Sequence, residues 1–168
     1  MHSSPRELQQ MLSEARSLEL GSSQQRQLLE QLRARCPAFF PALLLAGRAE
    51  LWSQDDSEQT DAIFDQVERM LQDAVDASGR SPEALLGLAR FMSVVRASPE
   101  AAETLYREAS TRTLELLEES WSGLIEALGE QDKTDEATRL AERARDIFPD
   151  SQQLAEARSF AKLGPQSV

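Results

Sequence analysis

Helix-start signals recur along the whole chain, and they constrain its fold more than any other feature. Ser81-Pro82-Glu83 and Ser98-Pro99-Glu100 each combine an N-cap residue, a proline at the first helical position and an acid near the positive helix end. Ser4, Ser22 and Asp150 are each followed three residues later by Glu or Gln, which is the pattern of a capping box. Apolar residues recur at helical spacing after these starts, so the sequence predicts an all-α fold without strands.

The most specific pattern lies between residues 118 and 149, on two short predicted helices. An aromatic residue and two leucines are followed by two alanines and a proline: Trp121, Leu124, Leu128, Ala137, Ala144 and Pro149. In order and spacing these residues resemble the tetratricopeptide repeat, whose first helix reads W-x2-L-G-x2-Y. The chain departs from the repeat where Ile125 replaces Gly, Leu128 replaces Tyr and Ala141 replaces Phe.

An overlay of other segments extends the resemblance along the chain. Residues 85–90 overlie residues 121–126 at an offset of 36, and residues 43–48 overlie residues 85–90 at an offset of 42. The resemblance therefore implies a right-handed α-solenoid of three to four antiparallel helix pairs plus a C-terminal helix, in one domain over residues 1–168. We expect the pairs at approximately 5–36, 38–78, 82–117 and 118–148, with a closing helix at 150–163.

The resemblance also implies a binding groove, because the first helix of each tetratricopeptide pair lines the concave face. The overlay makes Leu44 equivalent to Leu86 and Ser122, and it matches two further sets of first-helix positions outside the core: Arg48 with Arg90 and Glu126, and Trp52 with Val94 and Glu130. We expect a partner-binding groove lined by Leu44, Arg48, Trp52, Leu86, Arg90 and Val94.

Arg48 and Arg90 are in register one repeat apart, and the planar fork of arginine suits carboxylate recognition. The alternative is that each arginine forms an ordinary surface ion pair with a nearby acid. Trp52 is equally compatible with a groove contact and with burial beside Phe64. Some tetratricopeptide domains hold a chaperone's C-terminal carboxylate with Lys, Asn and Arg. Such binding is not expected here, because four residues depart from that pattern: Leu44, Leu86, Ser122 and Glu126.

The charge of the chain limits the classes of partner. The formal net charge is −11 and the sequence pI is about 4.6. An acidic surface repels phosphate backbones, so we expect no nucleic-acid binding, and a partner with a basic or apolar segment is more natural. The alternative is that the acidity only supports solubility.

The sequence carries no membrane or disulfide signal. No apolar run reaches the ~20 residues of a membrane-spanning helix. The single cysteine, Cys36, permits no intramolecular disulfide, and residues 1–10 are polar rather than signal-like. We therefore expect a cytoplasmic protein without membrane insertion.

The search for catalytic or metal-binding residues is negative. His2 is the only histidine, so neither a Ser–His or Cys–His pair nor a zinc site is expected. The acidic cluster of Asp55, Asp56, Glu58 and Asp61 lacks the glycine of a calcium loop, and a solvated loop explains it better. Phosphate-binding glycine loops are also missing. We expect no enzyme activity, no metal and no cofactor.

The sequence thus favours a non-catalytic adaptor or scaffold that binds a partner peptide or helix in a concave groove. The alternative is a dedicated chaperone or assembly factor for one client protein, which an apolar groove floor at Leu44, Leu86 and Val94 favours. A third interpretation, an enzyme or its regulatory subunit, has no nucleophile–base pair to support it. The identity of the partner and the oligomeric state are open at this level.

Overall fold

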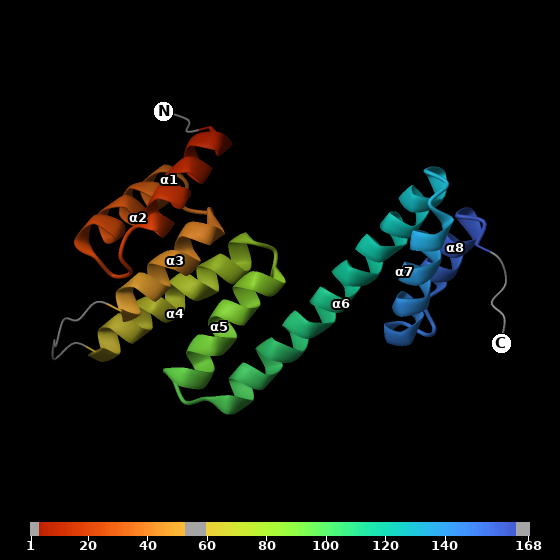
Figure 1. The fold of residues 1–168 in the computed structure, drawn as a ribbon. Helices are drawn as coiled ribbons and strands as arrows, with labels where there is room; N and C mark the ends of the chain where they lie inside the picture. The colour runs from red at the N-terminus through yellow and green to blue at the C-terminus, as the bar shows by residue number, and fades with distance from the viewer. Residues whose placement is uncertain (1–3, 53–59, 164–168) are drawn as a thin grey trace. The chain divides into compact units, whose positions relative to one another are not determined.

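The computed structural model describes residues 4–52 and 60–163, and this part of the chain is helical without strands (Figure 1). The helices are α1 (Pro5–Ser17), α2 (Ser23–Arg35), α3 (Phe40–Leu51), α4 (Thr60–Ala77), α5 (Pro82–Val94), α6 (Pro99–Glu130), α7 (Thr134–Ile147) and α8 (Gln152–Phe160). The all-α prediction is therefore confirmed. The chain divides into two compact units, residues 1–110 and residues 111–168. The handedness of the stack and the expected single domain stay predictions.

In the first unit, α3 contacts four other helices. It packs against α2 and α4, its neighbours in the chain, and also against α1 and α5 (Figure 1). The odd-numbered helices α1, α3 and α5 are therefore neighbours, as expected for stacked antiparallel pairs.

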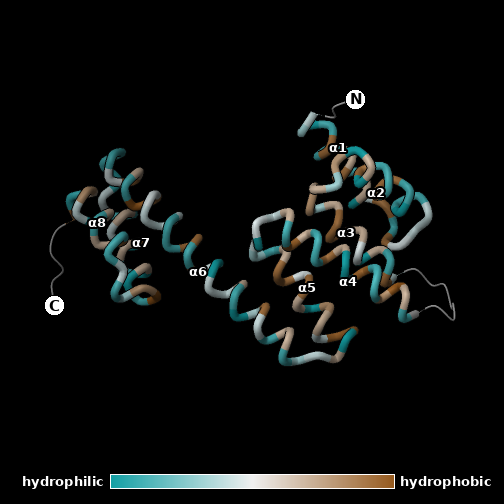
Figure 2. Tube along the Cα trace, turned by 180° about the vertical axis from the view of Figure 1, so that it is seen from behind, coloured by the Kyte–Doolittle hydropathy of each residue, from teal (hydrophilic) through white to brown (hydrophobic). Residues whose placement is uncertain are grey.

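A continuous apolar core fills the first unit. In Figure 2, hydrophobic stretches are frequent on α3, α4 and α5. The largest fully buried apolar side chains of this core are Leu12, Leu29, Leu32, Val67, Val75 and Leu85. Gly87 brings α5 close to α3, because a Cβ atom at this position would lie only 3.0 Å from Leu44 Cδ2. The Leu44 side chain therefore covers Gly87, at the surface where α3 meets α5.

The connection between α1 and α2 depends on a buried polar side chain. Gln25 is 1% exposed; its Oε1 accepts from the Gly21 N–H at 2.9 Å and its Nε2 donates to the Ala15 carbonyl at 2.9 Å. The predicted capping box at Ser22 is thus only half formed: the Ser22 hydroxyl caps the Gln25 N–H, but Gln25 does not reach back to Ser22. The box at Ser4 is complete.

The second unit contains the C-terminal part of α6 with α7 and α8. Its core is built from three alanines and two larger apolar residues: Ile125, Ala141, Ala144, Leu154 and Ala157. Trp121 packs against this core and meets the Phe148 ring edge-on, with 6.3 Å between the ring centroids. The Arg143 guanidinium lies over the Trp121 ring at 5.5 Å. The region of clearest sequence resemblance therefore has the core that its alanines predict.

Two residues of this pattern differ in burial from what the sequence predicts. Leu124, a motif leucine, is 48% exposed, whereas Ile125 beside it is fully buried. Ser122, expected on a concave face, is buried. Because successive helical residues are ~100° apart, Trp121, Ser122 and Ile125 share the inner face of α6 and Leu124 lies outside it.

Two predicted helix boundaries are also wrong. The break expected at residues 117–118 does not exist, because α6 is continuous from Pro99 to Glu130. Residues 111–120 contain neither Gly nor Pro, so nothing interrupts the hydrogen-bonding of the helix there. The last helix is capped by Ser151, whose hydroxyl accepts from the Leu154 N–H at 3.1 Å, rather than by Asp150.

Several sequence expectations fall outside the described residues. These are the solvated loop expected at Asp55, Asp56 and Glu58, and the terminal His2.

Replacing Gln25 with Leu should destabilise the first unit by ~2–4 kcal/mol. The change removes both partners of the Gln25 amide and leaves the Gly21 N–H and the Ala15 carbonyl unsatisfied, and each buried unsatisfied group costs ~1–3 kcal/mol. Urea unfolding followed by far-UV circular dichroism measures the loss. Gln24→Leu, an exposed neighbour on the same helix, is the control, and equal losses for the two variants would contradict this role.

Replacing Ala137 with Glu should disrupt the second unit, with a loss of ~3 kcal/mol or more. Ala137 is fully buried on α7, and a charge placed there has neither room nor a partner. Ala155→Glu makes the same chemical change at an exposed position of α8. Thermal unfolding compares the variants, and an unchanged midpoint for Ala137→Glu would contradict the packing described.

Candidate functional site

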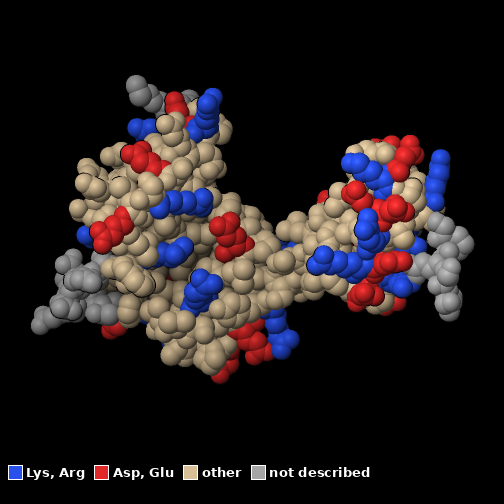
Figure 3. Space-filling view, in the orientation of Figure 1, with Lys and Arg blue, Asp and Glu red and all other residues tan. Residues whose placement is uncertain are grey.

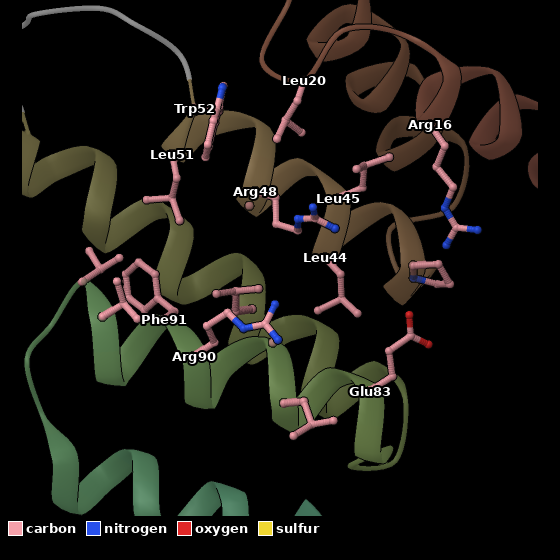
Figure 4. Close-up of a pocket in the computed structure, with 17 residues that line it drawn as sticks. Arg16, Leu20, Leu44, Leu45, Arg48, Leu51, Trp52, Glu83, Arg90 and Phe91 are labelled. Carbon is pink, nitrogen blue, oxygen red and sulfur yellow. The ribbon is translucent and has the colours of Figure 1, made fainter.

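A hollow of about 620 Å³ opens on the face that α1, α3 and α5 form in the first unit (Figure 4). We call it the groove. All the residues expected from the sequence to bind a partner line it: Leu44, Arg48, Trp52, Leu86, Arg90 and Val94. Side chains of α3 and α5, two helices that are distant in sequence, therefore lie on one surface.

Helix periodicity explains why these residues share a face. Leu44 and Arg48 are four residues apart on α3, and so are Leu86, Arg90 and Val94 in succession on α5. Residues at this spacing lie one above another along a helix. Because α3 and α5 are neighbours, the two rows lie side by side.

The apolar part of the groove is open to solvent. Leu86 is 42% exposed, Val94 75% and Trp52 67%, while Leu44 is half-buried against Gly87. Trp52 is the C-cap residue of α3, and its exposure favours the groove over burial beside Phe64, the other expectation from the sequence. The groove thus presents apolar surface that no described part of the chain covers.

Sequence reasoning missed part of the lining. Arg16 and Leu20 reach the groove from α1 and the turn after it, and Glu83 and Phe91 reach it from α5. Arg16 could have been predicted from its position in the last turn of α1, which is the first helix of a pair. The overlay did not extend to that helix because no motif residue anchors it.

The groove gathers positive charge. Its charged lining residues are Arg16, Arg48, Arg90 and Glu83. The Arg48 and Arg90 side chains extend from α3 and α5 into the same space (Figure 4). Within residues 4–52 and 60–163, none of the three arginine side chains forms an ion pair or a hydrogen bond with another side chain. The ordinary surface ion pairs considered for Arg48 and Arg90 are therefore not observed in the described chain.

Two arginines elsewhere in the first unit, Arg80 and Arg96, form ion pairs with another helix. Arg80 donates to Glu108 at 2.7 and 2.5 Å, and this hydrogen bond raises the pKa of Arg80 above its ordinary value. Arg96 binds Asp65 and, at 2.7 Å, Glu68, and the hydrogen bond with Asp65 is the main cause of its raised pKa. Arg80 precedes α5 and Arg96 follows it, and each links that connection to another helix, which gives both a structural role. The groove arginines have no such role.

A second hollow, of about 420 Å³, lies at α2, α3 and α4. Its lining is mostly polar and mixed in charge: Ser23, Arg26, Gln27, Leu29, Glu30, Arg33, Ala46, Ala49, Glu50 and Gln66. It lacks the exposed apolar floor of the groove, which makes the groove the stronger candidate for binding.

Among the described residues, no group of three or more His, Cys, Asp or Glu side chains is placed to hold a metal ion. None of the helices described has both the length and the apolar character that crossing a membrane requires.

Comparison with known proteins decides the family. Residues 1–79, which include α1 to α4, match the Myxococcota tetratricopeptide repeat protein family. A Myxococcus xanthus protein described as an uncharacterized 18.1 kDa protein in the carS 3' region is 35% identical over 161 residues, 96% of this chain and 95% of the relative. The chain belongs to the Myxococcota tetratricopeptide repeat protein family. Tetratricopeptide repeat proteins generally mediate protein–protein interaction and are generally non-enzymatic. No solved structure is significantly similar to this tetratricopeptide repeat chain.

The two tryptophans should differ sharply in their contribution to stability. Trp121→Ala removes a partly buried ring that contacts Phe148, and we expect a loss of ~2–4 kcal/mol. Trp52→Ala removes an exposed groove side chain and should cost less than ~1 kcal/mol. Urea unfolding of the two variants provides the comparison. A loss for Trp52→Ala as large as that for Trp121→Ala would place Trp52 in the core.

Proposed function

We propose that this chain is a non-catalytic adaptor or scaffold that binds a peptide or helix of a partner protein in the groove. One observation carries the proposal: residues at equivalent positions of two successive first helices, Leu44 with Leu86 and Arg48 with Arg90, line a single open hollow. Membership of a tetratricopeptide family supports this reading, because proteins of this type generally act through protein contacts.

The apolar floor supplies the driving force for binding. Fully burying a Leu or Val side chain contributes ~1.5–3 kcal/mol, and both Leu86 and Val94 are exposed in the free chain. A groove between parallel rows of side chains suits a partner helix, which places apolar residues every three or four positions along one face. An extended peptide is accommodated by the same surface.

A dedicated chaperone or assembly factor for one client is the second candidate. The exposed apolar floor at Leu86 and Val94 favours it, because such a surface covers an apolar segment of a client. This candidate requires that the client aggregate when the chain is absent, whereas an adaptor's partner stays soluble. Sedimentation of the partner with and without the chain separates the two.

We assign the function to the cytoplasm, because the free Cys36 suits a reducing compartment.

The experiment begins with a photo-crosslinking amino acid at position 94, in native cells, to identify the partner at the groove. The purified partner is then titrated calorimetrically against the wild type and the double variant Leu86→Gln with Val94→Gln. We expect at least about a tenfold loss of affinity for the variant, because its groove buries less apolar surface.

The matched control is Leu116→Gln with Ile147→Gln, which changes exposed apolar residues that do not line the groove. It should bind as the wild type does. A partner that binds the groove variant as tightly as the wild type, with matching circular dichroism, would refute the groove as the binding site.

A further inference from the structure

The charge of the groove is opposite to that of the chain. The net charge is −11, yet the groove carries three arginines against one glutamate, Glu83. In Figure 3, basic side chains lie amid uncharged surface on the first unit. A partner responds to the field where it binds, so the net charge is a poor guide to its chemistry. The basic segment expected from the net charge does not suit this groove.

We infer that the segment bound in the groove is acidic and amphipathic, with apolar side chains on the floor and carboxylates against Arg48 and Arg90. This inference rests on the groove function proposed above and specifies the partner. Arg48 and Arg90 extend into one space, and neither has a carboxylate partner within the described residues. Two neighbouring cations without counterions repel each other, and an anionic ligand relieves that repulsion.

The arginines are suited to recognition because nothing in the described fold uses them. Arg80 and Arg96 show what a structural arginine does in this chain, since each is held by carboxylates of another helix. Arg48, Arg90 and Arg16 are instead directed to the groove from three different helices. Planar guanidinium groups bind carboxylates with two parallel hydrogen bonds, which gives specificity for acidic side chains.

The rest of the lining favours a peptide over a nucleic acid. Apart from the three arginines and Glu83, every lining residue is apolar or a glycine. Nucleic acids bind chiefly through phosphate contacts, which would leave this apolar floor uncovered, and the acidic surface elsewhere repels their backbones. An acidic segment with leucine-like anchors satisfies both the floor and the arginines.

The test uses labelled helical peptides of one length with identical leucine positions. The positions that flank the leucines are all Glu in the first peptide, all Gln in the second and all Lys in the third. Fluorescence anisotropy measures the affinity of each peptide. For the wild type we expect the Glu peptide to bind about tenfold more tightly than the Gln peptide, and the Lys peptide to bind most weakly. Raising the salt concentration should reduce the advantage of the Glu peptide.

A charge-reversal variant tests whether Arg48 and Arg90 cause this preference. Arg48→Glu with Arg90→Glu should invert the order, so that the Lys peptide binds best. The matched control, Arg33→Glu with Arg69→Glu, makes the same change in net charge at residues that lie outside the groove. It should keep the wild-type order. An order that the groove reversal leaves unchanged, or that the control inverts equally, overturns the inference.

The remaining outcomes separate the two proposals. In one outcome, the Gln or Lys peptide binds the wild type as tightly as the Glu peptide, and the double variant Leu86→Gln with Val94→Gln binds all three peptides more weakly. This outcome overturns the acidic partner and leaves the groove as the binding site. If no peptide binds, or if that variant binds all three unchanged, the groove function itself is overturned. A single-stranded oligonucleotide that binds more tightly than the Glu peptide overturns the peptide as occupant.

Discussion

The packing of α3 between α1 and α5 is the constraint on which the rest of the first unit depends. A single amphipathic helix pair cannot bury its apolar face alone, so each pair needs its neighbour. Close approach requires small side chains, and α3 buries Ala42, Ala46, Gly47 and Ala49; at Gly47 the close neighbours are Leu71 and Val67 of α4. Gly87 on α5 performs the same task opposite Leu44. These contacts bring the outward rows of the odd-numbered helices together, and the groove is the surface that results.

Charge is divided between structure and binding in this unit. Arg80 and Arg96 lie near the ends of α5 and are held by carboxylates of α6 and α4. Arg48 lies in the last turn of α3 and Arg90 lies in the second half of α5, both on the face turned to the groove. Exposed ion pairs contribute little to stability, so leaving these two arginines without partners costs the fold little. The unpaired arginines give the acidic protein a local basic surface. This surface is the basis of the chemical selectivity proposed for the groove.

The sequence predicted some features well because their causes are local. The caps at Ser4 and Ser81 act within one helical turn, and the structure has both. The overlay placed the expected groove residues on one hollow because helical spacing alone decides which residues share a face. It failed at residues 117–118, where the repeat pattern suggested a new helix although no Gly or Pro interrupts α6. The family match covers residues 1–79 and therefore lies outside the clearest motif, at residues 118–149.

The sequence by itself determined that the chain is helical, where several helices begin, and which residues of each helix share a face. Only the tertiary structure decided the environment of single side chains. It buried Gln25 between two helices, exposed Leu124, and joined Arg16 to the arginines of α3 and α5. The physical reason is range: capping and periodicity act between residues a few positions apart, whereas burial and local charge depend on which helices pack together.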